Sequence, residues 1–410
     1  MRAYDRLHRL RKAQHARAFI DKDVADVARQ MAGDLGLDCE APPGGPRRPL
    51  ALQHGQSDFE LLLELAAQAG LHLRLEDQVL RLADLGGEGE AAVLTYGREL
   101  LEASVTLGGE TLRRASRVEA LGLGRIATFA GAADRPRSQP GGAADVGLDA
   151  FPDLGERVLT EWLADDRPAA VAMAQADLDR AAAATAVFEG LALGDPRLRP
   201  GRRVQLKGVS ATADHTFGLA CAVHTFDVQR GYVTHLSTAP PLRPVRRTGV
   251  RVTVGQISAV DDPEGLSRAR ARLPACGGLE TGWMQVLAEG AGDEKGLAVF
   301  PEPGDDVLVL APDGDFARAL ILGGLYGERA APLAASASRG KARPLGLATA
   351  AGQRLTLDSV EARASLATGA GDVFELTPDG ARLHATQDLV IEAPGRSLTI
   401  RARSVSFEQG

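Results

Sequence analysis

Histidine, cysteine and carboxylate side chains, the groups that most often bind metals or move protons, come together once in the second half of this chain. His224 and His235 flank Asp227, and Cys221 lies just before them. Zinc sites use three or four ligands at recurring spacings. Separations of three and eight residues on expected strands match none of these spacings. The sequence therefore predicts structural roles for these side chains and no metal site.

Other carboxylates fall in turn contexts. The Asp-Gly-Asp segment at 313–315 resembles the first half of a calcium loop but lacks the later ligands and the closing glutamate. The aspartate pairs at 261–262 and 305–306 stand where Asp hydrogen-bonds its own backbone. Walker A, GxSxG, HExxH and nucleotide-binding GxGxxG motifs do not occur in the sequence. We therefore expect a protein that is not an enzyme and has no cofactor.

Length and composition restrict the class of protein. A chain of 410 residues with 44% hydrophobic and 25% charged residues is typical of a folded protein of several domains. Its net charge of −7 argues against a protein that coats nucleic acid. Cys39, Cys221 and Cys276 are odd in number and far apart, which predicts free thiols in a reducing compartment. Residues 1–20 lack the apolar core of a signal peptide.

Two helices and a hairpin are expected within residues 1–86. Apolar residues recur at helical spacing over 24–35. Ser57 and Glu60 form a capping box at the start of a second helix. Residues 71–82 then alternate with a period of two around a polar turn, which predicts a β-hairpin.

A barrel of short strands is expected within residues 87–247. Alternating stretches run from about 91 to 130 and again from about 202 to 236. Between them lie a stretch rich in Gly, Pro and Ala at 131–149, which predicts a surface arm, and an Ala-rich helix at about 168–187.

Residues 248–329 contain short β-like stretches with turn residues at each junction, one of them GLAVFP at 296–301. Five or six short strands in about 80 residues are typical of a small closed barrel of the OB type. The following segment, 330–345, is dominated by small residues and Pro and predicts a linker.

The last segment, 346–410, repeats short alternating strands about every eight positions. A single short meander of this kind buries too little surface to be stable alone. We expect three chains to wind together so that no sheet edge stays free. The residues expected to fill the core of this trimer are Leu355, Leu357, Phe374, Leu376, Leu383, Leu389, Ile391, Leu398, Ile400, Val405 and Phe407.

Residues 255–327 carry a set of short motifs in a fixed order. Asp-Pro-Glu-Gly is followed by an Arg-rich strand, Gly-Trp, Pro-Glu-x-Gly-Asp-Asp-Val-Leu-Val, Gly-Asp and Leu-Gly-Gly-Leu-Tyr. This order resembles the OB-type domain of phage baseplate spikes and of the VgrG-like spikes of contractile injection systems. Segments at 4–37, 52–75, 198–206 and 223–236 are similar to the hub region of the same proteins. The motif residues of the OB domain are Asp262, Pro263, Gly265, Trp283, Pro301, Gly304, Asp305, Gly323 and Tyr326.

The resemblance implies a fold that is mainly β with some α. Hub β-barrel domains with inserted helices would be followed by an OB-type barrel and by an intertwined triple-stranded β-helix in a homotrimer. Family members carry further strands before the segment that begins at Tyr4, which leaves three alternatives for the first hub barrel: it is incomplete at its N-terminal side, the start of the sequence is wrongly assigned, or the barrel is reduced. The expected domains are the first hub domain (1–86), the second hub barrel (87–247), the OB domain (248–329), the linker (330–345) and the needle (346–410).

The resemblance also implies a mechanical function and a set of partners. Three copies would form the central hub and spike of a baseplate, which nucleates the tail tube and pierces the target envelope when a sheath contracts. The implied partners are tail tube initiator proteins, baseplate wedge proteins, effector cargo and a PAAR-like tip protein. Assembly without a signal peptide is expected in the cytoplasm, within a phage-tail-like particle, with extracellular release as one alternative. The residues expected at the tip contact are Phe407, Glu408 and Gln409.

Three questions stay open at this point. The first question is whether the particle is a phage tail, a type VI apparatus or an extracellular device. One rival is an OB-fold nucleic-acid-binding protein with a trimerising tail, although the aromatic residues that such a groove would use are widely separated along 248–329. The other rival is a cell-wall hydrolase within 87–247, for which no motif is present.

Overall fold

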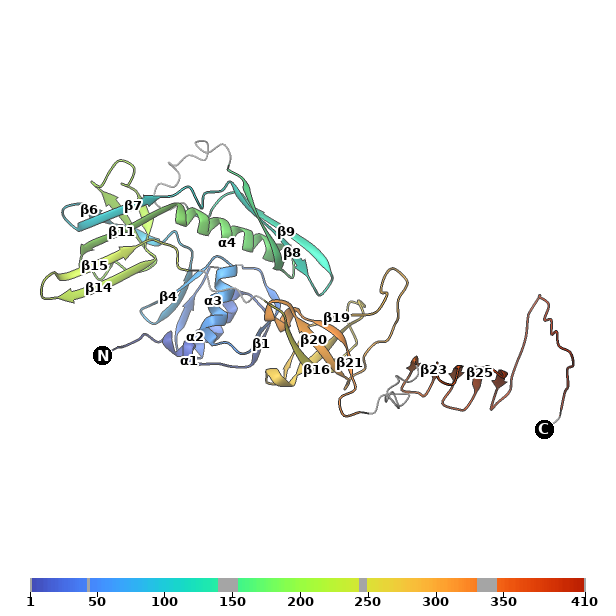
Figure 1. The fold of residues 1–410 in the computed structure, drawn as a ribbon. Coiled ribbons are helices and arrows are strands. Elements are labelled where there is room, and N and C mark those ends of the chain that lie inside the picture. Colours follow the sequence, from blue (N-terminus) through green and yellow to red (C-terminus); the bar gives the residue numbers. More distant parts are fainter. Residues whose placement is uncertain (1, 43–44, 139–153, 243–248, 330–344, 409–410) are drawn as a thin grey trace. The chain divides into compact units, whose positions relative to one another are not determined.

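The computed structural model describes residues 2–42, 45–138, 154–242, 249–329 and 345–408 (Figure 1). The chain separates into two units, Met1–Leu325 and Tyr326–Gly410. Strands dominate and helices are few, so the expectation of a mainly β protein with some α is confirmed. No helix among the described residues is long and apolar enough to cross a membrane.

The N-terminal region of the chain packs three helices against two small sheets. Asp23 caps one helix by accepting a hydrogen bond from the Asp26 amide at 2.8 Å. The predicted capping box of Ser57 and Glu60 is present at the start of another. The sheets pair β1 with β3, and β2 with β5 and β4. The elements are α1 (His8–Lys12), β1 (Arg17–Lys22), α2 (Val24–Gly33), β2 (Asp38–Glu40), β3 (Arg48–Gln53), α3 (Asp58–Gln68), β4 (His72–Glu76) and β5 (Val79–Ala83).

Two sheets in the next region enclose a core around Phe188 and Phe217, whose ring centroids lie 5.8 Å apart. Their strand orders are β14-β15-β11-β7 and β13-β12-β6. The strands are β6 (Glu88–Thr95), β7 (Leu100–Leu107), β11 (Ala186–Leu193), β12 (Arg202–Lys207), β13 (Thr216–Gly218), β14 (Cys221–Asp227) and β15 (Gly231–Ser237).

A helix and three strands form a second layer in this region. The Ala-rich helix is α4 (Arg167–Thr185), which lies along β8 (Ala115–Gly122) and β9 (Ala127–Ala133) (Figure 1). The approach is close, because a Cβ on Gly131 of β9 would lie 2.2 Å from the Val171 nitrogen.

Two expectations for this layer need correction. The arm expected at 131–149 starts later, because Gly131 still pairs with Val118 of β8. Residues 139–153 lie outside the described residues of the chain. A strand that the sequence analysis missed, β10 (Glu156–Leu163), pairs in parallel with β8.

The expected OB-type barrel is confirmed. The sheet runs β16-β20-β21-β19-β17-β18, and β16 also pairs with β17, which closes the barrel. Its core contains Val307, Val309 and Ile321, each without exposed surface. The stretch 296–301, expected as a strand, carries no strand pairing. The strands are β16 (Arg251–Ala259), β17 (Arg268–Leu273), β18 (Leu279–Glu280), β19 (Met284–Val286), β20 (Asp306–Ala311) and β21 (Leu320–Leu325).

The tail unit is a single antiparallel meander in which each strand pairs with the next along the chain. Short strands were also expected around 389–391, 398–400 and 405–407, and that expectation is wrong for the single chain, in which 385–408 contains no strand. A strand needs a hydrogen-bonded neighbour, and the described chain offers these segments none. The strands are β22 (Leu345–Ala348), β23 (Arg354–Asp358), β24 (Arg363–Ala367), β25 (Val373–Thr377) and β26 (Gly380–His384).

An ion pair joins the OB barrel to the layer of α4. Arg318 donates to both carboxylate oxygens of Asp165, at 2.9 and 2.6 Å, and to Asp315 at 3.2 Å. Burial alone would raise the pKa of Asp165, but the charge and hydrogen bonds of Arg318, together with the Arg48 charge, outweigh burial and hold that pKa below its ordinary value. Burial and the same Arg318 charge lower the pKa of nearby Arg48, on β3, to about 10. Three regions of the chain therefore meet in one charged cluster.

Arg318→Met should destabilise the chain by about 2–3 kcal/mol. The change leaves the Asp165 carboxylate, whose side chain is only 24% exposed, without its Arg318 partner. Breaking an ion pair costs about 3–5 kcal/mol when both partners are fully buried, and the partial exposure of Asp165 reduces that cost. Denaturant unfolding followed by the fluorescence of Trp162 and Trp283 measures the loss. Arg197→Met is the matched control, because Arg197 pairs with Asp195 while 83% exposed and should matter little. An equal loss of unfolding free energy in both variants would refute a stabilising role for the buried pair of Arg318 and Asp165.

Candidate functional site

One face of the tail sheet carries two rows of apolar side chains. In the strand register, Leu355 lies opposite both Leu347 and Leu366. Phe374 lies opposite Leu366 and Leu383, which completes a row across all five strands. Because side chains two apart on a strand share a face, the parallel row joins this one on the same side of the sheet. Its members are Leu345, Leu357, Ala364, Leu376 and Ala381.

The opposite face of the same sheet is polar. Thr356 lies opposite Ser365, and Ser365 lies opposite Glu375. Arg363 lies 3.5 Å from the Glu375 carboxylate. Ala348, Ala367 and Val373 also lie on this face, but its other side chains are polar, as in a sheet that buries one face and keeps the other in water.

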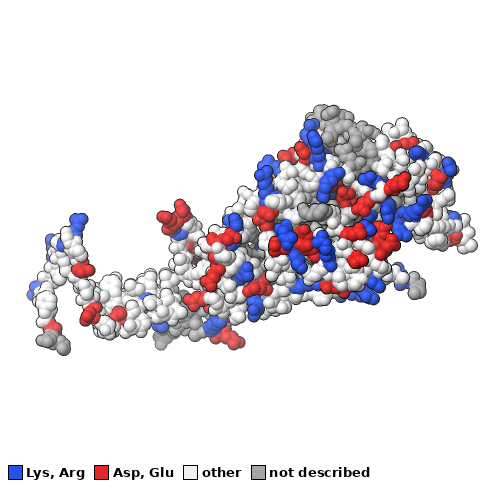
Figure 2. All heavy atoms as spheres, turned by 180° about the vertical axis from the view of Figure 1, so that it is seen from behind, with Lys and Arg blue, Asp and Glu red and all other residues white. Residues whose placement is uncertain are grey.

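The apolar face has no cover within the described residues of the chain. Its large side chains are between 44% and 75% exposed. An open groove of about 900 Å³ runs beside Leu345, Leu357 and Leu376. In Figure 2 the visible side of the tail is mostly uncharged. Contiguous exposed apolar surface of this kind marks an interaction site. We call the two rows the apolar face of the tail.

The residues predicted for the trimer core divide into two groups. Leu355, Leu357, Phe374, Leu376 and Leu383 all lie on the apolar face of the tail. Those between 385 and 408 are exposed and outside any strand: Leu389, Ile391, Leu398, Ile400, Val405 and Phe407. Of the expected tip residues, Glu408 is also exposed, and Gln409 lies outside the described residues.

Sequence reasoning missed Leu345, Leu347 and Leu366, which belong to the same face. Leu366 is the one large apolar residue of its strand and is flanked by Ser365 and Ala367. The alternation was therefore visible only through Ala364 and Leu366, which is a weak signal.

The OB motif residues serve turns and packing. Arg268 donates to both oxygens of Asp262, at 2.8 and 2.7 Å, which holds the pKa of that carboxyl well below its usual range. The guanidinium of Arg270 lies 4.6 Å from the ring of Trp283. Gly323 lies within β21 at an irregularity in its pairing with β20, and Pro301 is half-buried. The remaining residues lie in or beside turns or are exposed: Pro263, Gly265, Gly304, Asp305 and Tyr326.

His224 and Asp227, two of the side chains with possible metal-binding roles, have structural partners, and His235 lies exposed on β15. His224 Nδ1 lies 3.0 Å from both the Tyr232 hydroxyl and the Thr234 hydroxyl. Asp227 accepts hydrogen bonds from the backbone of the turn that follows it, which lowers its pKa. Across the residues that the structure describes, no three His, Cys, Asp or Glu side chains are grouped as a metal site would need.

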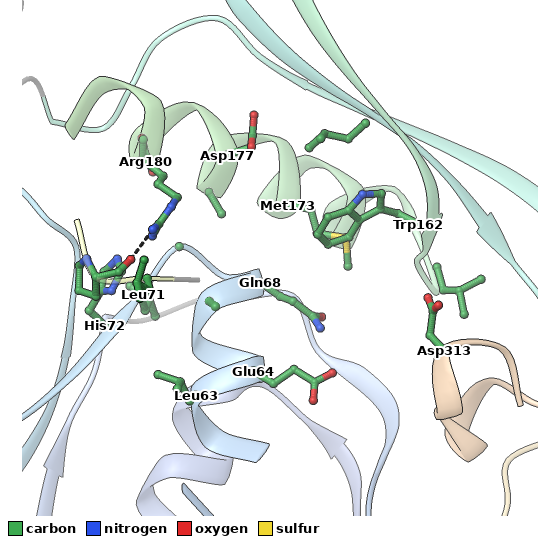
Figure 3. A pocket seen from close by; sticks show the side chains of 18 of the residues that line it. Leu63, Glu64, Gln68, Leu71, His72, Trp162, Met173, Asp177, Arg180 and Asp313 are labelled. Atoms are coloured by element: carbon green, nitrogen blue, oxygen red, sulfur yellow. Dashed lines mark hydrogen bonds between the residues drawn. The ribbon is translucent and has the colours of Figure 1, made fainter. Parts of the chain in front are cut away.

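A cavity of about 220 Å³ lies between α3, α4 and the 313–318 turn of the OB barrel (Figure 3). Its wall is mostly apolar, with Trp162 and Met173 on one side. Asp177 at its edge is held by Arg113 at 2.6 Å and Ser116 at 2.8 Å. Burial, with the nearby Arg180 charge, lowers the pKa of His72 to about 4, so this histidine is neutral at pH 7.

The chain combines a barrel region that contains helices, an OB barrel and a tail sheet with one apolar face. This combination defines the class of baseplate hub-and-spike proteins. The model of the phage tail baseplate hub (GPD) family matches residues 1–229. The model of the type VI secretion system/phage-baseplate injector OB domain matches residues 253–326. Because the first match covers more than half of the chain, the protein belongs to the phage tail baseplate hub family.

Solved structures to which this chain is similar include a VgrG complex, a type VI secretion component and a prophage tail protein. The VgrG-containing structure of the Francisella PdpA–VgrG complex has a TM-score of 0.52 at 9% identity, covering 92% of this chain and 64% of that one. The E. coli c3393 protein, a type VI secretion component, has a TM-score of 0.45 at 12% identity, with 78% and 76% covered. The 43 kDa tail protein of prophage MuSo2 from Shewanella oneidensis has a TM-score of 0.41 at 14% identity, with 55% and 66% covered. The search of curated proteins found no match.

The lowered pKa of His72 predicts a pH-dependent stability. An unfolded histidine takes up a proton near pH 6.5, whereas the folded one resists until about pH 4. Stability should therefore fall as the pH drops from 6.5 to 4, by up to about 3 kcal/mol from this group. His72→Gln should flatten that range of the curve in denaturant titrations, and His384→Gln, at an exposed position, should leave it unchanged. If the unfolding free energy of the His72→Gln variant still fell as steeply with pH between 6.5 and 4, the lowered pKa of His72 would be contradicted.

Proposed function

We propose that three copies of this chain form the central hub and spike of a contractile injection baseplate. The tail units would form the needle, and the barrels of residues 1–325 would form the hub and collar. The hub would nucleate the tail tube. The needle would be driven through the target envelope when the sheath contracts.

The observation that carries this proposal is the apolar face of the tail. Each chain supplies one sheet with an apolar side and a polar side. Three such sheets can close into a prism with the apolar faces inside and the polar faces in water. Two sheets would cover each other's apolar faces but leave their sheet edges open. In the proposed closure of three sheets the edges are protected as well, and unprotected edges would pair with foreign strands.

The energy available from this closure is large. Burying one Leu or Phe side chain is worth about 1.5–3 kcal/mol, and each chain offers eight such side chains in the two rows, at positions 345, 347, 355, 357, 366, 374, 376 and 383. Even if only half of the surface of these eight side chains is buried, their summed burial energy outweighs the contribution of any exposed ion pair on the polar face. A stiff needle that resists shear follows from this packing.

The residues after β26 fit the same assembly. Segment 385–408 finds no strand partner among the described residues of its own chain, yet it keeps spaced apolar residues such as Ile391 and Ile400. Strands from the two other copies would supply the missing hydrogen bonds and cover these side chains. The apolar end at Phe407 would then be covered by a PAAR-like tip protein.

We infer a mechanical role without catalysis. The further partners of the assembly would be tail tube initiator proteins, baseplate wedge proteins and effector cargo, with no nucleic acid. We propose that the trimer forms in the cytoplasm and joins a phage-tail-like particle. Membership of the baseplate hub family supports a place in a phage-tail-like particle with baseplate partners.

Leu355→Asp together with Leu366→Asp should remove the trimer. These residues face each other across β23 and β24 on the apolar face of the tail, so a trimer would hold six unpaired carboxylates around its axis. A buried unpaired charge costs several kcal/mol, and about 1.4 kcal/mol is a factor of ten in an equilibrium constant. Native mass spectrometry at a fixed concentration should show a loss of trimer of more than about tenfold.

Thr356→Asp together with Ser365→Asp is the matched control. These residues are the neighbours of the first pair and face each other on the polar side of the same two strands. The control should remain trimeric. A trimer of unchanged heat resistance in the leucine variant would overturn the proposed needle, as would a wild-type chain that is monomeric at all concentrations.

A further inference from the structure

A projecting segment of the OB barrel is apolar and is not covered by the described residues of its own chain. Residues 287–303 join β19 to β20 and leave the barrel as a long loop (Figure 1). We call this segment the OB arm. It folds back on itself, because Leu297 donates its amide to the Glu289 carbonyl at 2.9 Å. At its base, the Leu287 amide is bonded to the carbonyl of Ile321 in β21.

The apolar side chains of the OB arm are exposed along its length. Leu287 and Val299 are 65% and 64% exposed, and Leu297 and Phe300 are 43% and 41% exposed. A surface loop of this length would ordinarily be polar. Exposed apolar side chains that cluster in this way mark a surface that another molecule covers.

A second apolar surface lies on the outside of the same barrel. Val250, Val252 and Val254 are 61%, 52% and 47% exposed. Leu310 and Leu308, on the neighbouring strand β20, lie opposite Val252 and Val254 and are half-buried. We call these five exposed or half-buried residues the valine face. The residues that alternate with the two leucines already fill the barrel core. An outward sheet face is normally polar, so this one also calls for a partner.

We propose that the OB arm of one copy lies on the valine face of the next copy around the threefold axis. This inference rests on the proposed function, because the trimer of tails supplies the neighbouring copies. Residues 326–344 tether each OB barrel to its tail unit, so the three barrels stay at high local concentration. The arm and the face are different surfaces, and a contact of this head-to-tail type closes into a ring when the rotation fits.

The charges of the two surfaces agree with this pairing. The end of the OB arm carries Glu289, Asp293 and Glu294 against one lysine, Lys295. The groove beside Val252, of about 500 Å³, is lined by Arg251 and by histidines of the N-terminal region. The negative charges at the end of the OB arm attract the positive charge of Arg251 in this groove. The arm does not cover the valine face of its own copy in the structure, since the apolar side chains of both surfaces remain exposed.

Cysteine cross-linking of the full chain tests the proposal. Leu297, Val299 or Phe300 is changed to cysteine together with Val250, Val252 or Val254, in a background with Cys221→Ser and Cys276→Ser. At least one pair should give covalent trimers under mild oxidation, seen on a denaturing gel. Val299→Cys with Lys207→Cys, at an exposed position outside the OB barrel, is the control and should give none.

The outcomes separate this inference from the function on which it rests. If sedimentation reports trimers and no pair forms covalent trimers, the arm contact is wrong and the hub-and-spike function stands. If a pair cross-links only within one chain, the arm covers its own barrel and the inference is also wrong. If the chain sediments as a single copy, both proposals fail.

Discussion

Strands β22 to β26 of the tail find hydrogen-bond partners within one chain, but their apolar face finds no cover among the described residues of that chain. Each strand from β22 to β26 pairs with the next along the chain, so within this sheet only the outer edges of β22 and β26 lack a strand partner. The rows that include Leu355, Leu366 and Phe374 remain exposed, and water is the only cover that the described residues of a single copy leave them. Burial of apolar surface is the main favourable term in folding and association. The proposed assembly follows from this imbalance.

The body of the chain is built differently, because it completes its cores by itself. Leu52 of β3 is buried in the same cluster as Val307 and Ile321 of the OB barrel, so the N-terminal region and the OB barrel share a core. The ion pair of Arg318 and Asp165 adds a directional contact at the same junction. A shared core and a bidentate ion pair resist bending between the N-terminal region, the layer of α4 and the OB barrel.

Local signals in the sequence predicted local structure well. The capping box of Ser57 and Glu60, the Ala-rich helix after Asp166 and the alternating strands of the OB barrel depend on neighbours within a few residues, and each is present. Strand β10 was missed because its partner β8 lies far back along the chain. The strands expected after residue 385 are absent from the single chain because these segments have no strand neighbour among its described residues. Leu366 was missed because its neighbours are small, and residues 296–301 were expected to form a strand because Leu297 to Phe300 form a short apolar run bounded by Gly and Pro.

The central claim is that segment 385–408 gains strand partners from other copies. Amide hydrogen exchange of the full-length wild-type chain measures this directly, because only hydrogen-bonded amides exchange slowly. The account predicts strong protection across 389–407 in concentrated samples and its loss on dilution to single chains. Fast exchange of these amides in a sample that contains trimers would contradict it.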